Sequence, residues 1–193
     1  MSLLFFKRLL ANPIRVGYLV PSSPILTRKT ARCIDFSKPR TVVELGPGEG
    51  CHTRQIVRRM NPGSRLILVE LDGHFADHLE EQFVADTRVT VIHGDALHLP
   101  ELLAKLDCTD PDYIVSGIPF TIMERGLREQ IIASIARAMG PKSVFITYQV
   151  SLQLAEHELF EMKRRDHCLF NVPPLNVLQL TKAVPHGKQA SCL

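Results

Sequence analysis

Three acidic residues, Glu44, Glu70 and Asp95, each stand at or just beyond the end of an apolar, β-branched-rich run. A carboxylate can pair with a cation or accept hydrogen bonds from hydroxyl and amino groups. Ligands of open α/β sheets bind outside the carboxyl ends of the strands. Three acids at successive strand ends therefore predict a site for one small molecule.

A glycine-rich turn follows the first acid, with Gly46, Gly48 and Gly50 in the stretch VVELGPGEG. Such glycines let the backbone turn tightly and approach a ligand without an intervening side chain. The GxGxG spacing differs from that of dinucleotide loops, which aim a helix N-terminus at a pyrophosphate. A carboxylate in front suits a cation, and S-adenosylmethionine carries an ammonium and a sulfonium but no phosphate. The turn therefore predicts an S-adenosylmethionine site.

Strand-like and helix-like segments alternate along the chain. Apolar runs predict strands at 40–45, 65–71, 88–93, 112–117 and 142–148, and helical spacing predicts helices at 53–60, 73–85, 121–139 and 151–165. This alternation predicts an α/β fold whose sheet is mostly parallel, with helices on both faces. The segments flanking Pro173 and Pro174 are too close for a helical crossover, so they predict an antiparallel C-terminal hairpin at the sheet edge.

The composition is that of a globular domain, with 193 residues, 45% hydrophobic and 22% charged. The five cysteines are odd in number and form no CxxC pair, which indicates a reducing compartment and neither disulfides nor zinc. Apolar runs fall short of the roughly 18 residues that span a bilayer. Lys7 and Arg8 interrupt the first apolar stretch, unlike a secretory signal. We expect a cytoplasmic protein without a metal.

The N-terminal segment is basic and contains no acidic residue before Asp35. Within residues 2–15, leucines and phenylalanines fall on one arc of a helical wheel, opposite Lys7 and Arg8. This pattern predicts an interfacial helix that attaches the protein to the inner face of the cell membrane, an anionic surface. A helix packed on its own core, a presequence, a solvated helix face and a nucleic-acid contact are the alternatives.

The acids and the glycine loop together resemble the S-adenosylmethionine-dependent methyltransferases with a seven-stranded Rossmann-like sheet. The resemblance implies that Glu44 and the loop backbone hold the methionine part, Glu70 the ribose, and Asp95 with Ala96 the adenine. It also places Leu71 and Ser116 at the cofactor. With that domain over 38–183, we expect a basic helical segment over 1–37 and a flexible tail over 184–193.

The stretch SGIPF, which follows the fourth predicted strand, would then select the substrate. Adenine-N6 methyltransferases, including the rRNA adenine dimethylases, carry Asn or Asp, an apolar residue, Pro and an aromatic in this loop. The first side chain accepts from the amino group, the loop carbonyl assists, and the aromatic stacks on the base. In this chain Gly117 stands at the Asn position, and Ser116 lies one residue early. Glycine offers no side-chain acceptor.

Other stretches resemble the bacterial phospholipid N-methyltransferases, which methylate phosphatidylethanolamine towards phosphatidylcholine. These stretches are GYLVPSSPILTRKTAR (17–32), VVELGPGEG, SGIPF, ITYQ (146–149) and NVPPLNVLQL (171–180). Ile118 and Phe120 depart from that family's usual leucines. The resemblance implies a phospholipid substrate, contacted by Gly117, Ile118, Pro119, Phe120, Ser22 and Ser23.

A primary ammonium has no lone pair, so the site must receive or make the neutral amine. Tyr148 and Tyr18 are the candidates to take that proton or hold the amine. Both are also compatible with core positions, and Ser22 and Ser23 with a helix N-cap. We expect an N-methyltransferase acting on a phospholipid amine. The alternatives are an RNA adenine methyltransferase and a non-catalytic membrane-binding module.

Overall fold

The computed structural model describes residues 22–169 and 173–183. The predicted helix over 2–15, Tyr18 and the tail over 184–193 lie outside these ranges. The strands are β1 (Thr41–Leu45), β2 (Arg65–Glu70), β3 (Val89–His93), β4 (Tyr113–Ser116), β5 (Val144–Gln149), β6 (Phe160–Cys168) and β7 (Leu175–Lys182). The helices are α2 (Pro24–Arg32), α3 (Cys51–Val57), α4 (Gly73–Phe83), α5 (Leu99–Ala104) and α6 (Arg125–Ala138), with 3-10 turns at Ala96–His98 and Phe120–Ile122.

All seven strands form one sheet in the order β3-β2-β1-β4-β5-β7-β6. The first five are parallel, and β7 is antiparallel to both β5 and β6. The predicted Rossmann-like sheet with an antiparallel C-terminal hairpin is therefore confirmed. Because β1 lies between β2 and β4, the carboxyl ends of these three strands meet at one edge.

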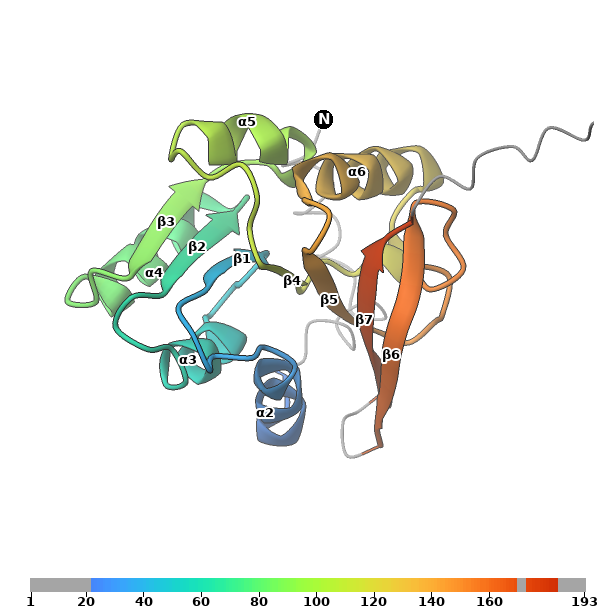
Figure 1. Ribbon diagram of the computed structural model, residues 1–193, viewed down its shortest axis with the longest axis horizontal. Helices are drawn as coiled ribbons and strands as arrows, with labels where there is room; N and C mark the ends of the chain where they lie inside the picture. The colour runs from blue at the N-terminus through green and yellow to red at the C-terminus, as the bar shows by residue number, and fades with distance from the viewer. Residues whose placement is uncertain (1–21, 170–172, 184–193) are drawn as a thin grey trace, which may run out of the picture.

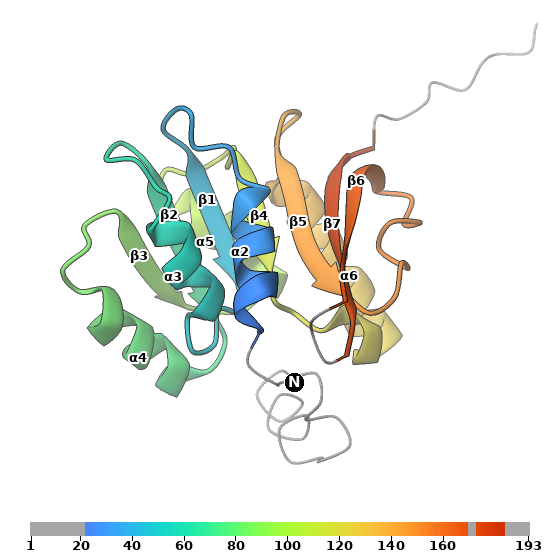
Figure 2. The ribbon, with the colours of Figure 1, turned by 90° about the horizontal axis from the view of Figure 1, so that it is seen from below.

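Helices cover both faces of the sheet, α5 and α6 on one and α2, α3 and α4 on the other (Figures 1 and 2). Successive strand residues point to opposite faces, so each strand serves two cores. In β1, Val43 packs in the core beneath α6, and Val42 packs in the core with Ile56 of α3. Both faces of β1 are thus buried, as a central parallel strand requires.

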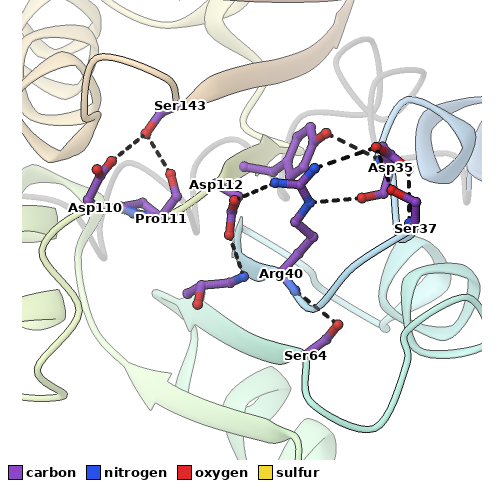
Figure 3. A network of polar contacts seen from close by, with 10 residues as sticks. Asp35, Ser37, Arg40, Ser64, Asp110, Pro111, Asp112 and Ser143 are labelled. Atoms are coloured by element: carbon purple, nitrogen blue, oxygen red, sulfur yellow. Dashed lines mark hydrogen bonds and ion pairs between the residues drawn. The ribbon is translucent and has the colours of Figure 1, made fainter.

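A polar network ties the strand starts together at the edge opposite the three acids (Figure 3). Arg40 donates from Nη1 to Asp112 Oδ1 at 2.8 Å, and the other carboxylate oxygen of Asp112 accepts from the Thr41 backbone N–H at 2.8 Å. The Arg40 backbone N–H donates to Ser64 Oγ at 3.1 Å. These contacts fix the starts of β1, β2 and β4 relative to one another, and hence the register that aligns their carboxyl ends.

The helix predicted over 151–165 is wrong. Residues 151–159 form turns and loop, and the chain then enters β6. Only the first and last residues of β6, Phe160 and Cys168, are buried, because β6 is the edge strand and its charged middle faces solvent. That middle carries no alternation of apolar and polar residues from which a strand could be predicted. The short helix α5 was also not predicted.

No helix in the described part of the chain is long and apolar enough to cross a membrane.

Candidate active site

The glycine loop between β1 and α3 presents bare backbone at the carboxyl edge of the sheet. Gly46 and Gly48 have φ of 64° and 55°, in the left-handed region that glycine adopts without strain. The Gly46 N–H donates to the Val69 carbonyl at 2.9 Å, which anchors the loop to β2. A Cβ placed on Gly48 would meet no protein atom within 4 Å, so its backbone faces open space. A ligand can approach the chain at this point.

Glu44 lies at the base of this loop and is 2% exposed. One of its carboxylate oxygens accepts a hydrogen bond from Thr53 Oγ1 at 2.8 Å. Burial raises the pKa of Glu44 to about 7, the bond from Thr53 lowers it, and the nearby Glu70 raises it further. Gly50 occupies the N-cap position of α3, so Thr53 lies within the helix. Its hydroxyl orients Glu44.

Glu70, at the end of β2, bridges the glycine loop and the start of α4. Its two oxygens accept from the backbone N–H groups of Gly48 and Asp72, each at 3.0 Å. The residue is 1% exposed, and this burial raises the pKa of its carboxyl. Each oxygen keeps a further lone pair, so a ribose hydroxyl could still donate to it.

The pair of buried carboxylates fits a cationic ligand. Among the described residues, no lysine, arginine or histidine forms an ion pair with Glu44 or Glu70. A buried carboxylate without a positive partner is unfavourable in its charged form. A ligand that brings a positive charge to this edge relieves that penalty. The predicted S-adenosylmethionine meets this requirement, whereas a phosphate would add negative charge.

This electrostatic arrangement predicts a bell-shaped pH dependence of cofactor affinity. As pH rises to about 7, Glu44 ionises and affinity should increase by up to about tenfold per pH unit. Above about 8, the ligand's own α-amino group loses its proton and affinity should fall. Equilibrium dialysis of S-adenosylmethionine between pH 5.5 and 9, about two units either side of the expected maximum, measures this profile. An affinity that stays flat below pH 7 would contradict the role of Glu44.

The third acid lies where β3 ends, next to the same edge. Asp95 Oδ1 accepts from the Leu97 N–H at 3.0 Å and so caps the 3-10 turn that begins with Ala96. Its other oxygen could accept a hydrogen bond from an adenine amino group, as predicted. Leu71 directly follows Glu70, and its carbonyl lies 3.2 Å from His93 Nε2. The parallel sheet thus brings the predicted adenine, ribose and methionine residues to one edge.

The loop after β4 is held closed by its own hydrogen bonds. Ser116 is fully buried, and its hydroxyl oxygen accepts from the Ile118 N–H at 3.1 Å. The Ile118 carbonyl accepts from two donors, the Phe120 N–H at 2.9 Å and Gln149 Nε2 at 2.8 Å. Both lone pairs of this carbonyl are therefore used within the protein. Gln149, which sequence reasoning did not single out, is 4% exposed and acts as the anchor of the loop.

Gly117 has no room for a side chain. A Cβ placed there would lie 2.6 Å from the Tyr148 hydroxyl and 2.8 Å from the Gly46 carbonyl oxygen. The hydroxyl of Tyr148 thus occupies the direction in which an Asn side chain would leave the backbone. It also brings the end of β5 into contact with the loop after β4, close to the glycine loop.

Phe120 belongs to the core. It is 2% exposed and meets Phe145 edge-to-face, with ring centroids 6.5 Å apart. Its ring is not presented at the loop surface as a platform on which a base could stack. Pro119 precedes it and opens the short 3-10 turn at Phe120–Ile122.

Tyr148 is stacked on a histidine that sequence reasoning missed. The rings of Tyr148 and His52 are 4.3 Å apart and nearly parallel, at 8°. His52 is 4% exposed, and burial lowers its pKa to about 3, so the ring is neutral. Among the described residues neither of its nitrogens has a hydrogen-bond partner. The only signal in the sequence was its place next to Thr53, directly after the glycine loop.

The segment before α2 reaches the same cluster. A side-chain hydrogen bond joins Ser22 to Tyr148. Ser23 is the N-cap of α2 and accepts from the Leu26 N–H at 3.2 Å. Burial raises the pKa of the Tyr148 phenol, and the nearby Glu44 raises it further. In the described residues, no group of three or more His, Cys, Asp or Glu could hold a metal ion.

Comparison with known proteins gives a family match and relatives that are similar over most or over part of the chain. Residues 22–182 match the family model of ribosomal RNA adenine dimethylase. The ornithine lipid N-methyltransferase of Singulisphaera acidiphila is 30% identical over 174 residues, which cover 90% of each chain. The ribosomal RNA small subunit methyltransferase A of Phenylobacterium zucineum is 36% identical over 97 residues. Those residues cover 50% of this chain and 32% of that protein.

Solved structures share the fold at low sequence identity. A SAM-dependent methyltransferase from Aquifex aeolicus superposes with a TM-score of 0.64 at 12% identity, covering 93% of this chain and 98% of that one. The 1,6-didemethyltoxoflavin-N1-methyltransferase of Burkholderia thailandensis, solved with S-adenosylhomocysteine, gives 0.64 at 14% identity. That superposition covers 82% of this chain and 78% of the other. At these identities the likeness concerns the fold alone.

Proposed function

The chain belongs to the ribosomal RNA adenine dimethylase family of S-adenosylmethionine-dependent methyltransferases, and we propose that its own substrate is the amine of a lipid headgroup. The protein would transfer methyl groups to the nitrogen of this amine at a membrane surface. Phosphatidylethanolamine, the substrate that the sequence suggested, and an ornithine lipid both carry such an amine.

The observation that carries the proposal is the state of the loop after β4. The resemblance implies that adenine-N6 methyltransferases hold the target amino group with a side chain at the position of Gly117, assisted by a carbonyl of this loop. Here the side chain is excluded by the Tyr148 hydroxyl and the Gly46 carbonyl, and the Ile118 carbonyl of the loop already accepts two hydrogen bonds. A buried site rejects a group whose donors it leaves unpaired. This loop therefore supports an amine that is held differently.

The extent of the similarity also supports a lipid substrate. The match to the ornithine lipid N-methyltransferase covers both proteins almost completely. By contrast, the chain spans about a third of the length of the ribosomal RNA methyltransferase from Phenylobacterium.

When bound, S-adenosylmethionine supplies an electrophilic methyl group on its sulfonium. The protein contributes position and exclusion of water, since transfer requires the amine nitrogen in line with the bond that breaks. Tyr148 keeps its proton at neutral pH because burial and Glu44 raise its pKa. Its oxygen can accept a hydrogen bond from the amine, so we assign it to holding the substrate rather than removing its proton. Ser22, bonded to Tyr148, orients that hydroxyl.

RNA adenine methylation is the second candidate, favoured by the family model and by the matches to ribosomal RNA methyltransferases. It requires a stacking surface for the base as well as an acceptor for the amino group. Phe120 is buried within the core, so it offers no stacking surface for a base. The hydrogen bonds of the loop occupy the Ile118 carbonyl, so it is not available as an acceptor for the amino group.

Incubation with methyl-labelled S-adenosylmethionine separates the two candidates. One reaction contains phosphatidylethanolamine vesicles, a second contains ornithine lipid vesicles, and a third contains unmodified ribosomal RNA. We expect label in a lipid, with mass spectrometry placing each added methyl group on the headgroup nitrogen. The control is Glu44→Gln, which at a low concentration of S-adenosylmethionine should label the accepted substrate about ten- to a hundredfold more slowly than the wild type does. Label in RNA alone would overturn the lipid proposal, and label in none would favour a binding module.

A further inference from the structure

Two exposed apolar side chains lie on elements that reach the carboxyl edge of the sheet. Ile25, in the first turn of α2, is 47% exposed, and Leu169, directly after β6, is 71% exposed. Large exposed apolar residues on neighbouring elements mark an interaction surface more often than a single exposed apolar residue does. Their position relative to the site decides what kind of surface this is.

Both residues belong to the carboxyl edge of the sheet. Ser22, just before α2, is bonded to Tyr148 at the end of β5. Leu169 follows the end of β6. That end pairs with the start of β7, where Asn176 lies opposite Gln149 at the end of β5. In Figure 2 the start of α2 and the end of β6 both lie towards the lower edge, where the arrow of β5 ends. The two apolar residues therefore lie at the same edge of the sheet as the loop after β4.

The elements that carry these residues are in contact with each other. Lys29 of α2 donates a hydrogen bond from Nζ to the carbonyl of His167 in β6. Leu26 and Cys168, the neighbours of Ile25 and Leu169 in sequence, pack in the same core. One side of α2 and the end of β6 thus form a continuous surface.

This surface is strongly basic. Residues 24–33 and 161–169 contain six lysines and arginines and two acids, whereas the whole chain has a net charge of +3. Asp166 is one of the two acids and is paired with Arg164 at 3.1 Å. The Arg164 side chain is nevertheless 66% exposed, and Arg28 and Arg32 are exposed on α2. The excess of positive charge remains available to an anionic partner.

We propose that this surface, the α2–β6 patch of Ile25, Arg28, Arg32, Arg164 and Leu169, docks the protein on an anionic lipid bilayer. Its apolar residues enter the interface while its arginines contact headgroup phosphates. Exposed aliphatic residues beside cations suit a bilayer, whereas single-stranded RNA calls for aromatic stacking surfaces. None of the five patch residues is aromatic.

Docking in this orientation turns the carboxyl edge of the sheet towards the membrane. A headgroup amine could then reach the loop after β4 without the lipid leaving the bilayer. This consequence rests on the proposed function, but the patch itself does not. It is also separate from the predicted helix over residues 2–15, so the two can be tested independently.

The test is cosedimentation of the full chain with vesicles of phosphatidylglycerol and phosphatidylcholine, without S-adenosylmethionine. We expect binding that weakens with salt, and about a hundredfold weaker partition for Ile25→Ser/Leu169→Ser, because each aliphatic side chain contributes about tenfold when buried. Arg28→Glu/Arg32→Glu should weaken binding most at low salt. Matched controls are Val84→Ser, at an 83% exposed position after α4, and Lys142→Glu, before β5; both should bind like the wild type.

The patch is refuted if the double serine variant binds like the wild type, or if the wild type does not bind anionic vesicles. A second readout distinguishes docking from catalysis. Short-chain phosphatidylethanolamine dispersed as monomers should be methylated at the same rate by the wild type and by the double serine variant, since the bilayer is absent. If vesicles are bound through the patch but neither lipid form is methylated, the proposed function fails and the docking surface stands.

Discussion

Replacing Glu44 by Gln is expected to weaken S-adenosylmethionine binding by about ten- to a hundredfold while making the protein more stable above pH 7. The loss reflects one charge-assisted hydrogen bond, which contributes about 1.5–3 kcal/mol. The gain arises because the pKa of Glu44 is raised in the fold from 4.5 to about 7. A carboxyl of this kind stabilises the protein below pH 4.5 and loses that contribution as pH rises through 7, by up to about 3 kcal/mol. Glutamine carries no such penalty.

Thermal unfolding without ligand and calorimetric titration with S-adenosylmethionine measure the two effects on the same sample. The matched control is Glu80→Gln, an exposed acid on α4, which should change neither. A parallel loss of stability and affinity in Glu44→Gln would show that the residue is structural. Unchanged affinity would remove Glu44 from the cofactor site.

Replacing Gly117 by Ala is expected to abolish most methyl transfer, although it adds only one methyl group. The new Cβ would lie 2.8 Å from the Gly46 carbonyl, which is backbone and cannot swing away as a side chain would. Relief requires the loop after β4 and the glycine loop to move apart, which costs about 1–3 kcal/mol of stability. Displacement by about 1 Å can lower a rate by about a hundredfold.

Two further variants give this prediction its control. Gly126→Ala adds the same atom in α6, where it meets only the flexible carboxylate of the exposed Glu124 at 3.3 Å, so activity should persist. Gly117→Ala/Tyr148→Phe removes the hydroxyl contact and leaves the contact with Gly46, so activity should stay low. Initial rates with each variant and the wild type make the comparison. A fully active Gly117→Ala would show that the loop is not tightly packed against Gly46.

The sequence predicted the centre of the sheet because β1, β2, β4 and β5 are buried on both faces and read as continuous apolar runs. The same runs located Glu44, Glu70 and Asp95 at strand ends, where the parallel topology brings them together. β6 could not be predicted in this way, because it is an edge strand whose middle residues are exposed except for the half-buried Asp166. α5 is a six-residue helix with a proline in its first turn, too short to show a period.

The loop after β4 shows what sequence alone left out. The sequence showed that Gly117 has no side-chain acceptor where adenine-N6 methyltransferases carry Asn or Asp. It did not show that the Tyr148 hydroxyl occupies the space of that side chain. The bond from Gln149 to the Ile118 carbonyl joins residues 31 apart in the chain, and no local pattern encodes it. The stacking of His52 on Tyr148 is likewise a tertiary contact between α3 and β5. Such contacts become visible only once the register of the strands is known.

The proposal depends above all on the carboxyl edge holding a positively charged methyl donor. Calorimetric titration of the wild-type chain with S-adenosylmethionine near pH 7.5, between the two expected pKa values, tests this most directly. We predict saturable binding of one molecule per chain. The absence of any saturable heat would contradict the site, and the assignment of a lipid amine as its methyl acceptor would fall with it.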